Sequence, residues 1–332
     1  VAMGVGALFI IAIGENPIDA YAALFRGAFD GELRLGTTLA GFTPLLLTSI
    51  AFAVAAKAGA FNVGVEGEVF LGGITAAYIG INWTFLPKPA LYVACFVGAM
   101  VVAAAWAFIP AVLRAYYNVN EVCTTILMNT VALYITSYLV SGPMSAGTAN
   151  AQSLPVTVRL YQFMKPSSVN VGIFIAAITV IVIIFMLQKS SWGYKIRTVG
   201  LNPTHADYVG IDSKKVFVGA MMLSGMLGGM AGCIEVLGVH GYFLNNFATG
   251  LGSNGMLAAL IVKNNMVSTP FMAFFLAVLK SGAMGMQQST GVPKSLVDTI
   301  TAVFIIIATM ETAFQFTKKR KKKTEEKKED KA

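Results

Sequence analysis

Long apolar runs follow one another through almost the whole of this 332-residue chain. Hydrophobic residues make up 56% of it and charged residues only 12%, whereas a soluble domain carries about a quarter charged residues. So little charge cannot cover a surface in water, and lipid is therefore the expected solvent. Because a bilayer core about 30 Å thick requires about 20 apolar residues in a helix, the runs predict an all-α, polytopic integral membrane protein.

Ten apolar segments are candidates for transmembrane helices, and the third and the eighth of them are short or interrupted. We place the ten segments at residues 1–13, 35–56, 61–81, 90–113, 122–140, 169–187, 216–237, 252–262, 270–284 and 296–316. We expect residues 1–316 to form one transmembrane domain and residues 317–332 to form a disordered basic tail. The chain opens inside an apolar run without a charged leader, so we also expect residues to be missing before Val1 rather than a signal peptide.

Basic residues indicate the orientation of the helices, since cytoplasmic loops carry an excess of lysine and arginine. Nine of the 24 lysines and arginines lie in the last fifteen residues, KKRKKKTEEKKEDKA. With that tail inside, the inner loops and the tail hold seventeen basic residues and the outer loops six. Ten spans then place both termini in the cytoplasm. We assign the basic tail to solvent and to anionic membrane lipid, and we expect no nucleic acid partner.

The inner loop between the sixth and seventh segments contains a short helix with both ends marked. Asn202 is a suitable N-cap, Pro203 suits the first helical position, and Gly210 can take the left-handed conformation that closes a helix. The predicted helix at 203–209 has about two turns and would be marginal in water. Something must therefore hold it, and two possibilities are open: a partner protein, or the chain's own membrane domain.

A glycine-rich stretch at 55–73 covers the third segment and the loop before it. Glycines permit a broken helix, and irregular backbone at membrane depth survives only when it is buried in protein or lines a watery cavity. Carboxylates such as Glu66 are costly there and often functional. The alternative is an ordinary inner loop with its glutamates in headgroup water. A second interrupted segment at 250–265 suggests, as a geometric hypothesis, paired broken helices on a substrate route.

Small and polar residues inside other segments have structural explanations. The seventh segment holds two G-x-x-x-G pairs, Gly225/Gly229 and Gly228/Gly232, and small residues at that spacing let helices approach closely. We interpret these pairs as packing positions. Asn129, inside the fifth segment, could bond to a neighbouring helix or face a pathway.

The sequence contains no convincing catalytic constellation. It has no G-x-x-x-x-G-K-[ST] loop, so the chain does not hydrolyse ATP by that route. His205 and His240 lack neighbouring metal ligands, and the three cysteines have no metal or redox spacing. We therefore predict a protein that is not an enzyme, with no catalytic residue and no metal site.

Three motifs together resemble the inner-membrane permeases of the ribose, galactose and nucleoside ABC importers. They are FNVGVEGE at 61–68, NEVCTTILMN at 120–129 and VGLNPTHADYVGI at 199–211. The resemblance covers most of the chain, and FNVGVEGE is most similar to the nucleoside branch, the guanosine-type permeases. It implies a permease subunit, with residues 1–316 as the permease domain, that carries nucleosides or simple sugars across the cytoplasmic membrane.

The resemblance also implies the partners of the chain. They are a second permease, commonly a different one that gives a heterodimer, a cytoplasmic ATP-binding subunit, and an extracytoplasmic substrate-binding protein or lipoprotein. The chain itself would bind no cofactor, because the partner ATPase uses the ATP and Mg²⁺. In such families the inner-loop helix docks into the ATPase, and the matching positions here are Gly200, Leu201, Asn202, Pro203, Ala206, Tyr208, Gly210 and Ile211.

A pathway for nucleosides would need stacking surfaces and a few hydrogen-bond partners. Our candidates for lining it are Phe61, Asn62, Glu66, Phe70, Asn129 and Phe247. The main alternative is an ion-coupled secondary transporter of a small polar solute. Such a protein would work without an ATPase and would need membrane-embedded carboxylates, for which Glu235 and Glu311 are the candidates.

Overall fold

The computed structural model of the chain describes residues 16–290 and nine further positions, namely 7, 8, 10, 11, 14, 295, 298, 299 and 302. The predicted tail at 317–332 lies wholly outside the described residues, and the predicted spans at 1–13 and 296–316 lie outside them except at those few positions. Contacts divide the chain into two compact units, Gly31–Ala277 and a second one made of Val1–Asp30 and Val278–Ala332. The larger unit contains every candidate residue of the pathway and of the inner-loop helix.

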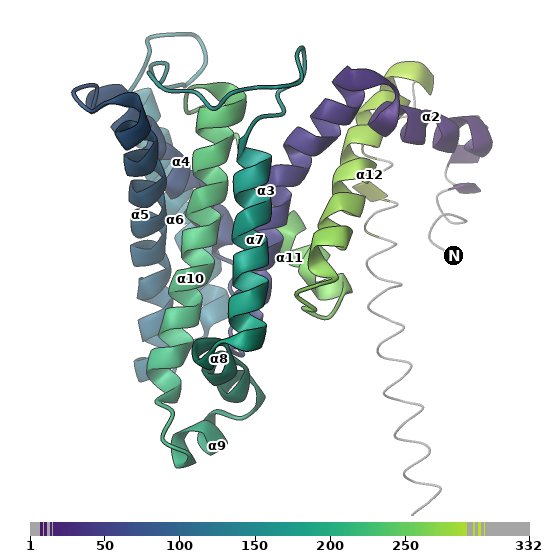
Figure 1. Ribbon diagram of the computed structural model, residues 1–332. Coiled ribbons are helices and arrows are strands. Elements are labelled where there is room, and N and C mark those ends of the chain that lie inside the picture. The colour runs from purple at the N-terminus through teal and green to yellow at the C-terminus, as the bar shows by residue number, and fades with distance from the viewer. Residues whose placement is uncertain are drawn as a thin grey trace, which may run out of the picture. The chain divides into compact units, whose positions relative to one another are not determined.

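The prediction of an all-α fold is confirmed, since the described residues form helices and loops without a strand and with three isolated β-bridges. Figure 1 shows the course of the chain. The helices are α2 Pro17–Phe29, α3 Gly31–Lys57, α4 Val65–Asn82, α5 Lys88–Tyr117, α6 Glu121–Ser141, α7 Gly172–Lys189, α8 Ser191–Leu201, α9 Pro203–Tyr208, α10 Ser213–Ile234, the π-helix η1 Glu235–His240, α11 Leu251–Ile261 and α12 Thr269–Thr290.

Six helices of the described part are long and apolar enough to cross a membrane: α3, α5, α6, α7, α10 continued by η1, and α12. The prediction of about ten spans is therefore not confirmed. The two interrupted segments account for part of the difference. The helix α4 begins only at Val65, after irregular backbone, and carries two glutamates in its first turn. The helix α11 has 11 residues, too few to cross a bilayer core.

Glycines bring α4, α5 and α10 into close contact inside the larger unit. A Cβ at Gly225 would lie 2.7 Å from the Ala103 carbonyl oxygen of α5. A Cβ at Gly232 would overlap with the Val69 carbonyl oxygen of α4. Backbone atoms cannot move aside as a side-chain tip can, so these positions require glycine. The interpretation of the G-x-x-x-G pairs as packing positions is confirmed.

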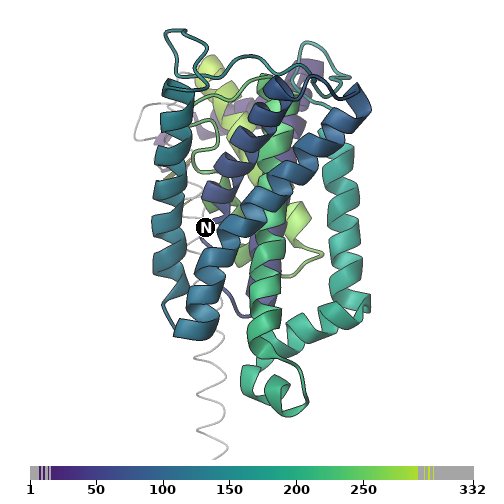
Figure 2. The same ribbon diagram turned by 90° about the vertical axis from the view of Figure 1, so that its left-hand side faces the viewer.

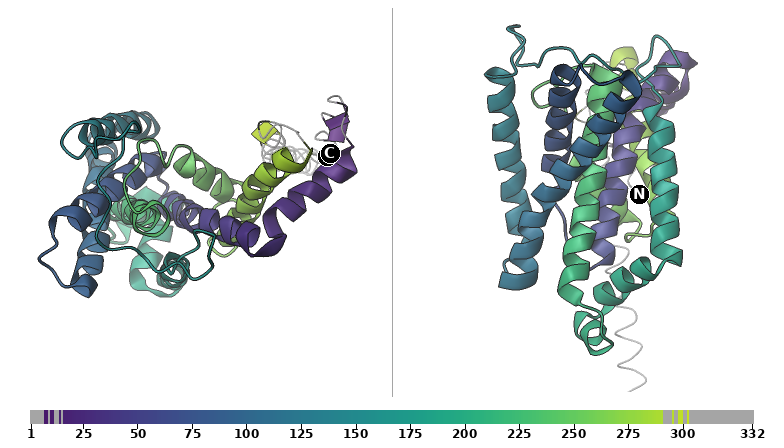
Figure 3. Two further views of the ribbon diagram at one scale, coloured as in Figure 1. Left: turned by 90° about the horizontal axis from the view of Figure 1, so that it is seen from above. Right: turned by 60° about the vertical axis from the view of Figure 1, so that its left-hand side comes forward.

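The helices of the larger unit differ in how much of their surface is covered. The helices α3 and α10 are buried over most of their length, whereas a third or less of α5, α6 and α7 is buried. Figure 3 shows the helices from above and from one side. The exposed residues of α5 and α7 over their middle turns are aliphatic or phenylalanine, as expected of surfaces in contact with lipid, and they include Val97, Val101, Ile178, Ile181 and Phe185.

The two ends of the larger unit carry different structures. The short helices α8 and α9 lie at one end, and the long α6–α7 loop lies at the other (Figure 2). That loop is attached to the helices by backbone hydrogen bonds, from Val156 N to Gly241 O at 2.9 Å and from Leu160 N to Leu237 O at 2.9 Å. The loop is therefore a segment fixed against η1 and the residue that follows it.

The smaller unit is held by a close approach between α2 and the later part of α12. A Cβ at Gly27 would lie 2.7 Å from the Gly285 Cα atom. Buried side chains beside this contact form a small apolar cluster that includes Leu24, Ala283 and Met286. Small residues again set the helix spacing, as they do in the larger unit.

Replacement of Gly232 by alanine tests the packing of α10 against α4. We expect Gly232→Ala to lower the free energy of unfolding by about 1–3 kcal/mol, the usual cost of overpacking, because the new methyl group meets a backbone oxygen. Thermal unfolding of the detergent-purified protein measures the change. The matched control is Gly41→Ala, a helical position with no heavy atom within 4 Å of the added Cβ. Equal effects of the two substitutions would contradict the packing.

Candidate functional site

The irregular backbone between α3 and α4, residues 58–64, is hydrogen-bonded by two asparagine side chains. We call it the break. Gly59 has φ +80° and turns the chain after α3. Asn62 Oδ1 accepts from Gly64 N at 2.9 Å. Asn129 of α6 donates from Nδ2 to Val63 O at 2.8 Å and accepts at Oδ1 from Gly67 N at 2.8 Å. Backbone groups that leave the helical pattern inside a membrane domain need such partners.

The same Asn62 connects the break to α10 through a buried polar network. Its Nδ2 group donates to Glu68 Oε1 at 2.9 Å and to Ser224 Oγ at 2.9 Å. The three residues are at most 1% exposed, so each of these bonds is screened from solvent. The other carboxyl oxygen of Glu68 has no partner among the described residues, and a Cβ at Gly228 would lie 2.9 Å from it. The site prediction did not include Glu68 or Ser224.

Glu66 joins the two interrupted segments that the sequence analysis paired. Its Oε1 accepts from Gly250 N at 3.0 Å, and the Ser253 hydroxyl donates to its Oε2 at 3.3 Å. The helix α11 begins with Gly250 as N-cap, which has no side chain to satisfy the free N–H groups. Glu66 supplies that cap from α4, and its negative charge suits the positive end of the helix dipole. A Cβ at Gly252 would lie 2.5 Å from Glu66 N, so the two segments are in direct contact.

Aromatic rings pack beside the break. Phe70 is buried and meets Phe247 edge-on, with 5.6 Å between the ring centroids. Phe61 is half-buried and meets Phe52 of α3 edge-on at 5.0 Å.

Four of the six pathway candidates, Phe61, Asn62, Glu66 and Asn129, therefore lie in or beside the break, whereas Phe70 and Phe247 pack together further along α4. The described contacts of all six are with other parts of the chain, and their role in lining a route stays a prediction.

The predicted inner-loop helix is present as α9, and its N-cap is confirmed. Asn202 Oδ1 accepts from His205 N at 3.0 Å, and Pro203 occupies the first turn. The helix ends at Tyr208, so the prediction of a helix to residue 209 was wrong by one residue: Val209 already has a non-helical ψ of 13° as the C-cap. Gly210 follows with φ +81°, as expected for the closing position.

Contacts on one side hold α9 to its own membrane domain, while its other side is open. Ala206 is fully buried, and its carbonyl oxygen accepts from Ile211 N at 2.9 Å. The Asp207 carboxylate accepts from Ser213 N and from the Ser213 hydroxyl, both at 2.9 Å, and so ties α9 to the first residue of α10. Tyr208, by contrast, is 84% exposed. Both possibilities left open by the sequence thus have support, packing for Ala206 and a free surface for Tyr208.

Asp212 caps the start of α10, next to the hydrogen bonds between Asp207 and Ser213. Its carboxylate accepts from Lys215 N at 3.0 Å and pairs with Lys215 Nζ at 2.9 Å. The backbone N–H of Lys215, followed by its ammonium group, holds the pKa of Asp212 below its usual range. The carboxylate therefore stays charged at neutral pH and keeps the cap.

The helix α8, which precedes α9, was missed in the sequence analysis. Its signal is the N-cap Ser190, whose Oγ accepts from Gly193 N at 3.0 Å. Leu201, the last residue of α8, is 88% exposed. Gly200 beside it packs against the end of α3: an added Cβ would overlap with the Lys57 carbonyl oxygen and would lie 3.1 Å from Gly59 N. The α8–α9 pair therefore touches the chain at the start of the break.

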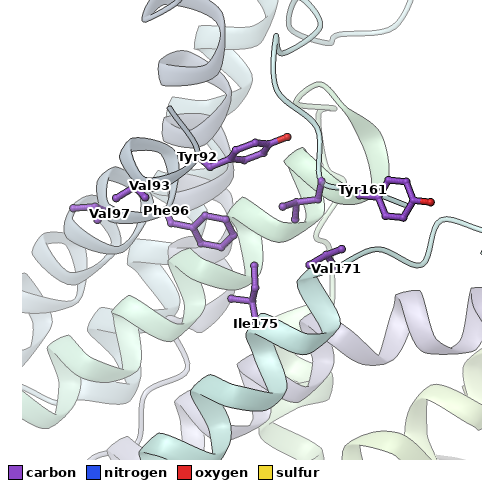
Figure 4. Close-up of a pocket in the computed structure, with 8 residues that line it drawn as sticks. Tyr92, Val93, Phe96, Val97, Tyr161, Val171 and Ile175 are labelled. Atoms are coloured by element: carbon purple, nitrogen blue, oxygen red, sulfur yellow. The ribbon is translucent and has the colours of Figure 1, made fainter. Parts of the chain in front are cut away.

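A cavity of about 500 Å³ lies away from the break, near the first residues of α5 and α7, and Figure 4 shows its lining. The lining is apolar except for two tyrosine hydroxyls, and Tyr92 donates its hydroxyl proton to Arg159 O at 2.6 Å. None of the pathway candidates belongs to it. The lining residues are Tyr92, Val93, Phe96, Val97, Leu160, Tyr161, Val171 and Ile175. Among the described residues no group of three potential metal ligands exists.

Comparison with known proteins identifies the family. Residues 34–309 match the family described as branched-chain amino acid transport system / permease component. The chain belongs to this permease family. No solved structure matches it.

Relatives of the chain are ABC transporter permeases. It is 32% identical over 330 residues to the guanosine ABC transporter permease protein NupP of Bacillus subtilis, covering 97% of this chain and 94% of NupP. It is 32% identical to the glucose ABC transporter permease protein TsgB13 of Haloferax volcanii, over 92% of this chain and 83% of that one. It is 31% identical to the nucleoside ABC transporter permease protein NupB of Lactococcus lactis, over 90% of this chain and 85% of that one.

These findings confirm the resemblance drawn from the three motifs. The chain is a multi-pass membrane permease subunit of an ABC importer, a transport subunit and not an enzyme, and it works with an ATPase and a binding protein. The alternative of an ion-coupled secondary transporter has no support among these relatives.

Substitution of Glu66 tests the cap on α11. We expect Glu66→Ala to destabilise the protein by about 1 kcal/mol, the typical cost of a lost N-cap, since Gly250 N and the Ser253 hydroxyl lose their acceptor. Glu66→Gln retains one acceptor oxygen and should fall between the alanine variant and the parent. Thermal unfolding in detergent gives this order. A glutamine variant as unstable as the alanine variant would show that charge, and not the hydrogen bond, stabilises α11.

Replacement of Gly200 tests the contact between α8 and the break. Because an alanine methyl group would overlap with the Lys57 carbonyl oxygen, Gly200→Ala should separate α8 from the end of α3. We expect the assembled transporter to lose severalfold of its substrate-stimulated ATPase activity. Gly41→Ala again serves as the control, with activity equal to the parent. Full stimulation in an assembled Gly200→Ala complex would exclude this contact from coupling.

Proposed function

We propose that this chain and a second, different permease form the membrane pathway of an ABC importer that carries nucleosides into the cytoplasm. The observation that carries the proposal is the likeness, at 31–32% identity over at least 90% of this chain, to two permeases named for guanosine and nucleosides. The motif FNVGVEGE, which carries the resemblance to the nucleoside branch, forms the break and the first turn of α4.

The proposed ATPase-docking surface is the exposed side of α8 and α9. Leu201 and Tyr208 are 88% and 84% exposed although both are large and apolar or aromatic. Rigid apolar and aromatic side chains of this kind are common anchors in protein interfaces. The chain would bind no cofactor itself, because ATP and Mg²⁺ would be used by the docked subunit.

The end with α8 and α9 would face the cytoplasm. Basic residues are concentrated there, in agreement with the rule that cytoplasmic loops are positively charged. They are Lys57, Arg114, Lys189, Lys195, Arg197, Lys214 and Lys215. The binding protein, soluble or lipid-anchored, would approach the opposite end, where the α6–α7 loop lies. Both termini would then be cytoplasmic, as the basic tail predicts.

Two contacts would transmit a movement of α9 to the pathway. The first is direct: Gly200 of α8 touches the end of α3 and the start of the break. The second passes through α10, whose first residue is bonded to Asp207 of α9 and whose Ser224 is bonded to Asn62. A displacement of α9 would therefore be transmitted to the break both through the end of α3 and through α10. Packed glycine contacts favour rigid-body movement of α10 over bending, since interiors of this density have discrete arrangements.

Simple sugars are the second candidate substrate. The relative named for glucose is 32% identical to this chain over 92% of its length, which is as high as the identity to the relative named for guanosine. Nucleosides and sugars share a ring with several hydroxyl groups, so the same hydrogen-bond partners could serve both. The nucleobase is the part that distinguishes them.

Uptake by proteoliposomes tests the proposed substrate. The permease would be reconstituted with its partner permease, ATPase and binding protein, and radiolabelled guanosine, cytidine, uridine, glucose and leucine would be offered singly. We expect ATP-dependent, saturable accumulation of nucleosides and none of leucine. Accumulation of glucose without nucleosides would contradict the proposal in favour of the sugar alternative. Accumulation without an ATPase would contradict the whole assignment.

A further inference from the structure

The exposed faces of the larger unit are not chemically uniform. Over their middle turns α5 and α7 expose aliphatic residues and phenylalanine, whereas α4 and α6 expose tyrosines, in α6 together with aliphatic residues. Tyr78 is 50% exposed, Tyr134 69% and Tyr138 71%. Tyrosines at a membrane interface would account for Tyr138, three residues before the end of α6. Tyr134 lies deeper, about 10 Å below that end at a rise of about 1.5 Å per residue. The surface of α4 and α6 therefore carries tyrosines away from the helix end as well as aliphatic side chains.

A second cavity, of about 430 Å³, opens on this surface. That volume is within the range of about 300–1,000 Å³ that small-molecule sites occupy. Its walls come from α4, the end of α6 and the α6–α7 loop. The lining residues are Ile74, Thr75, Tyr78, Ile81, Asn82, Leu139, Pro143, Met144 and Leu154.

This cavity has polar groups that are available to a ligand. Two donors are already occupied: the Thr75 hydroxyl donates to Leu71 O at 2.7 Å, and Asn82 Nδ2 donates to Tyr78 O at 2.9 Å. The Tyr78 hydroxyl and the Asn82 carboxamide oxygen have no partner among the described residues. Tyr78 shares the lining of the cavity with aliphatic residues such as Ile74 and Ile81. The cavity near α5 and α7 differs in that no carboxamide lines it and the hydroxyl of Tyr92 is bonded, which leaves the hydroxyl of Tyr161 as its available polar group.

The position of the cavity suits an entry site. It lies at the end of the unit with the α6–α7 loop, opposite α8 and α9 (Figure 2). The same helix α4 that lines it begins at the break, where Glu68 and Asn62 form the buried network. A solute leaving the binding protein would reach this cavity before the break, and α4 connects the two places.

We propose that this cavity receives the nucleobase of an incoming nucleoside, with the Tyr78 ring as its stacking surface and Asn82 as its hydrogen-bond partner. The inference rests on the proposed nucleoside substrate. Aromatic side chains stack on every nucleobase, because each base has a π face, and such contacts need no base-specific pattern. A carboxamide oxygen accepts from the amino or imino groups of a base. A sugar has no aromatic face and would gain little from the Tyr78 ring.

Photolabelling with 8-azidoguanosine tests the site in the assembled transporter. We expect adducts on residues 74–82 of α4, and excess guanosine should compete them away. Tyr78→Leu, which keeps apolar bulk but removes the ring, should reduce labelling about tenfold, in line with the strength of base–aromatic stacking. Tyr78→Phe, which keeps the ring, should label nearly as well as the parent.

Tyr161→Leu is the matched control, because Tyr161 is 72% exposed and lines the apolar cavity at the same end. Its labelling should equal that of the parent. Undiminished labelling in an assembled Tyr78→Leu complex, or adducts confined to other helices, would overturn the inference even if the parent imports nucleosides. A parent complex that imports glucose and no nucleoside would instead overturn the proposed function on which the inference rests.

Discussion

Hydrogen bonding of irregular backbone inside a membrane domain is the constraint on which this structure depends. The chain leaves the helical pattern between α3 and α4 in a mostly buried segment, where lost backbone bonds need partners from the protein. Asn62, within the break itself, and Asn129 of α6 supply those partners with their side chains. Their positions fix α6 and α4 relative to the break. The break is therefore a specific, bonded structure and not a flexible gap, and movement there requires that its neighbours move with it.

Close glycine packing surrounds that bonded core. The α10 glycines face backbone atoms of α4 and α5, and Gly228 faces the carboxyl group of Glu68. Where its glycines meet backbone atoms, a helix packed in this way passes a displacement on to its neighbours, since backbone atoms cannot move aside as side-chain tips can. The α10 helix begins at Ser213, whose backbone N–H donates to the carboxylate of Asp207 in α9. The α8–α9 end and the break are thus connected through a stiff element, as a transporter driven from one side requires.

The sequence predicted local features well and long-range ones poorly. The Asn202 cap, the Pro203 start and the Gly210 closure are local signals, because each acts on backbone within four residues. The partnership of Asn62 with Ser224 spans 162 positions, and no pattern in one sequence reveals it. Glu66 was named as a pathway candidate because it is a carboxylate at predicted membrane depth. Only the structure shows that it is hydrogen-bonded to the start of α11. Of the ten predicted spans, those at 61–81 and 252–262 are interrupted or too short, and those at 1–13 and 296–316 lie almost wholly outside the described residues.

Site-specific photo-crosslinking tests the central claim most directly, namely that the α8–α9 end receives the ATPase. A benzophenone amino acid would replace Tyr208 in the assembled transporter, and Tyr161 at the opposite end in a parallel preparation. The account predicts a covalent adduct with the ATPase subunit from position 208 and none from position 161. An adduct with the ATPase from position 161, or none from position 208 in a complex that hydrolyses ATP, would contradict it.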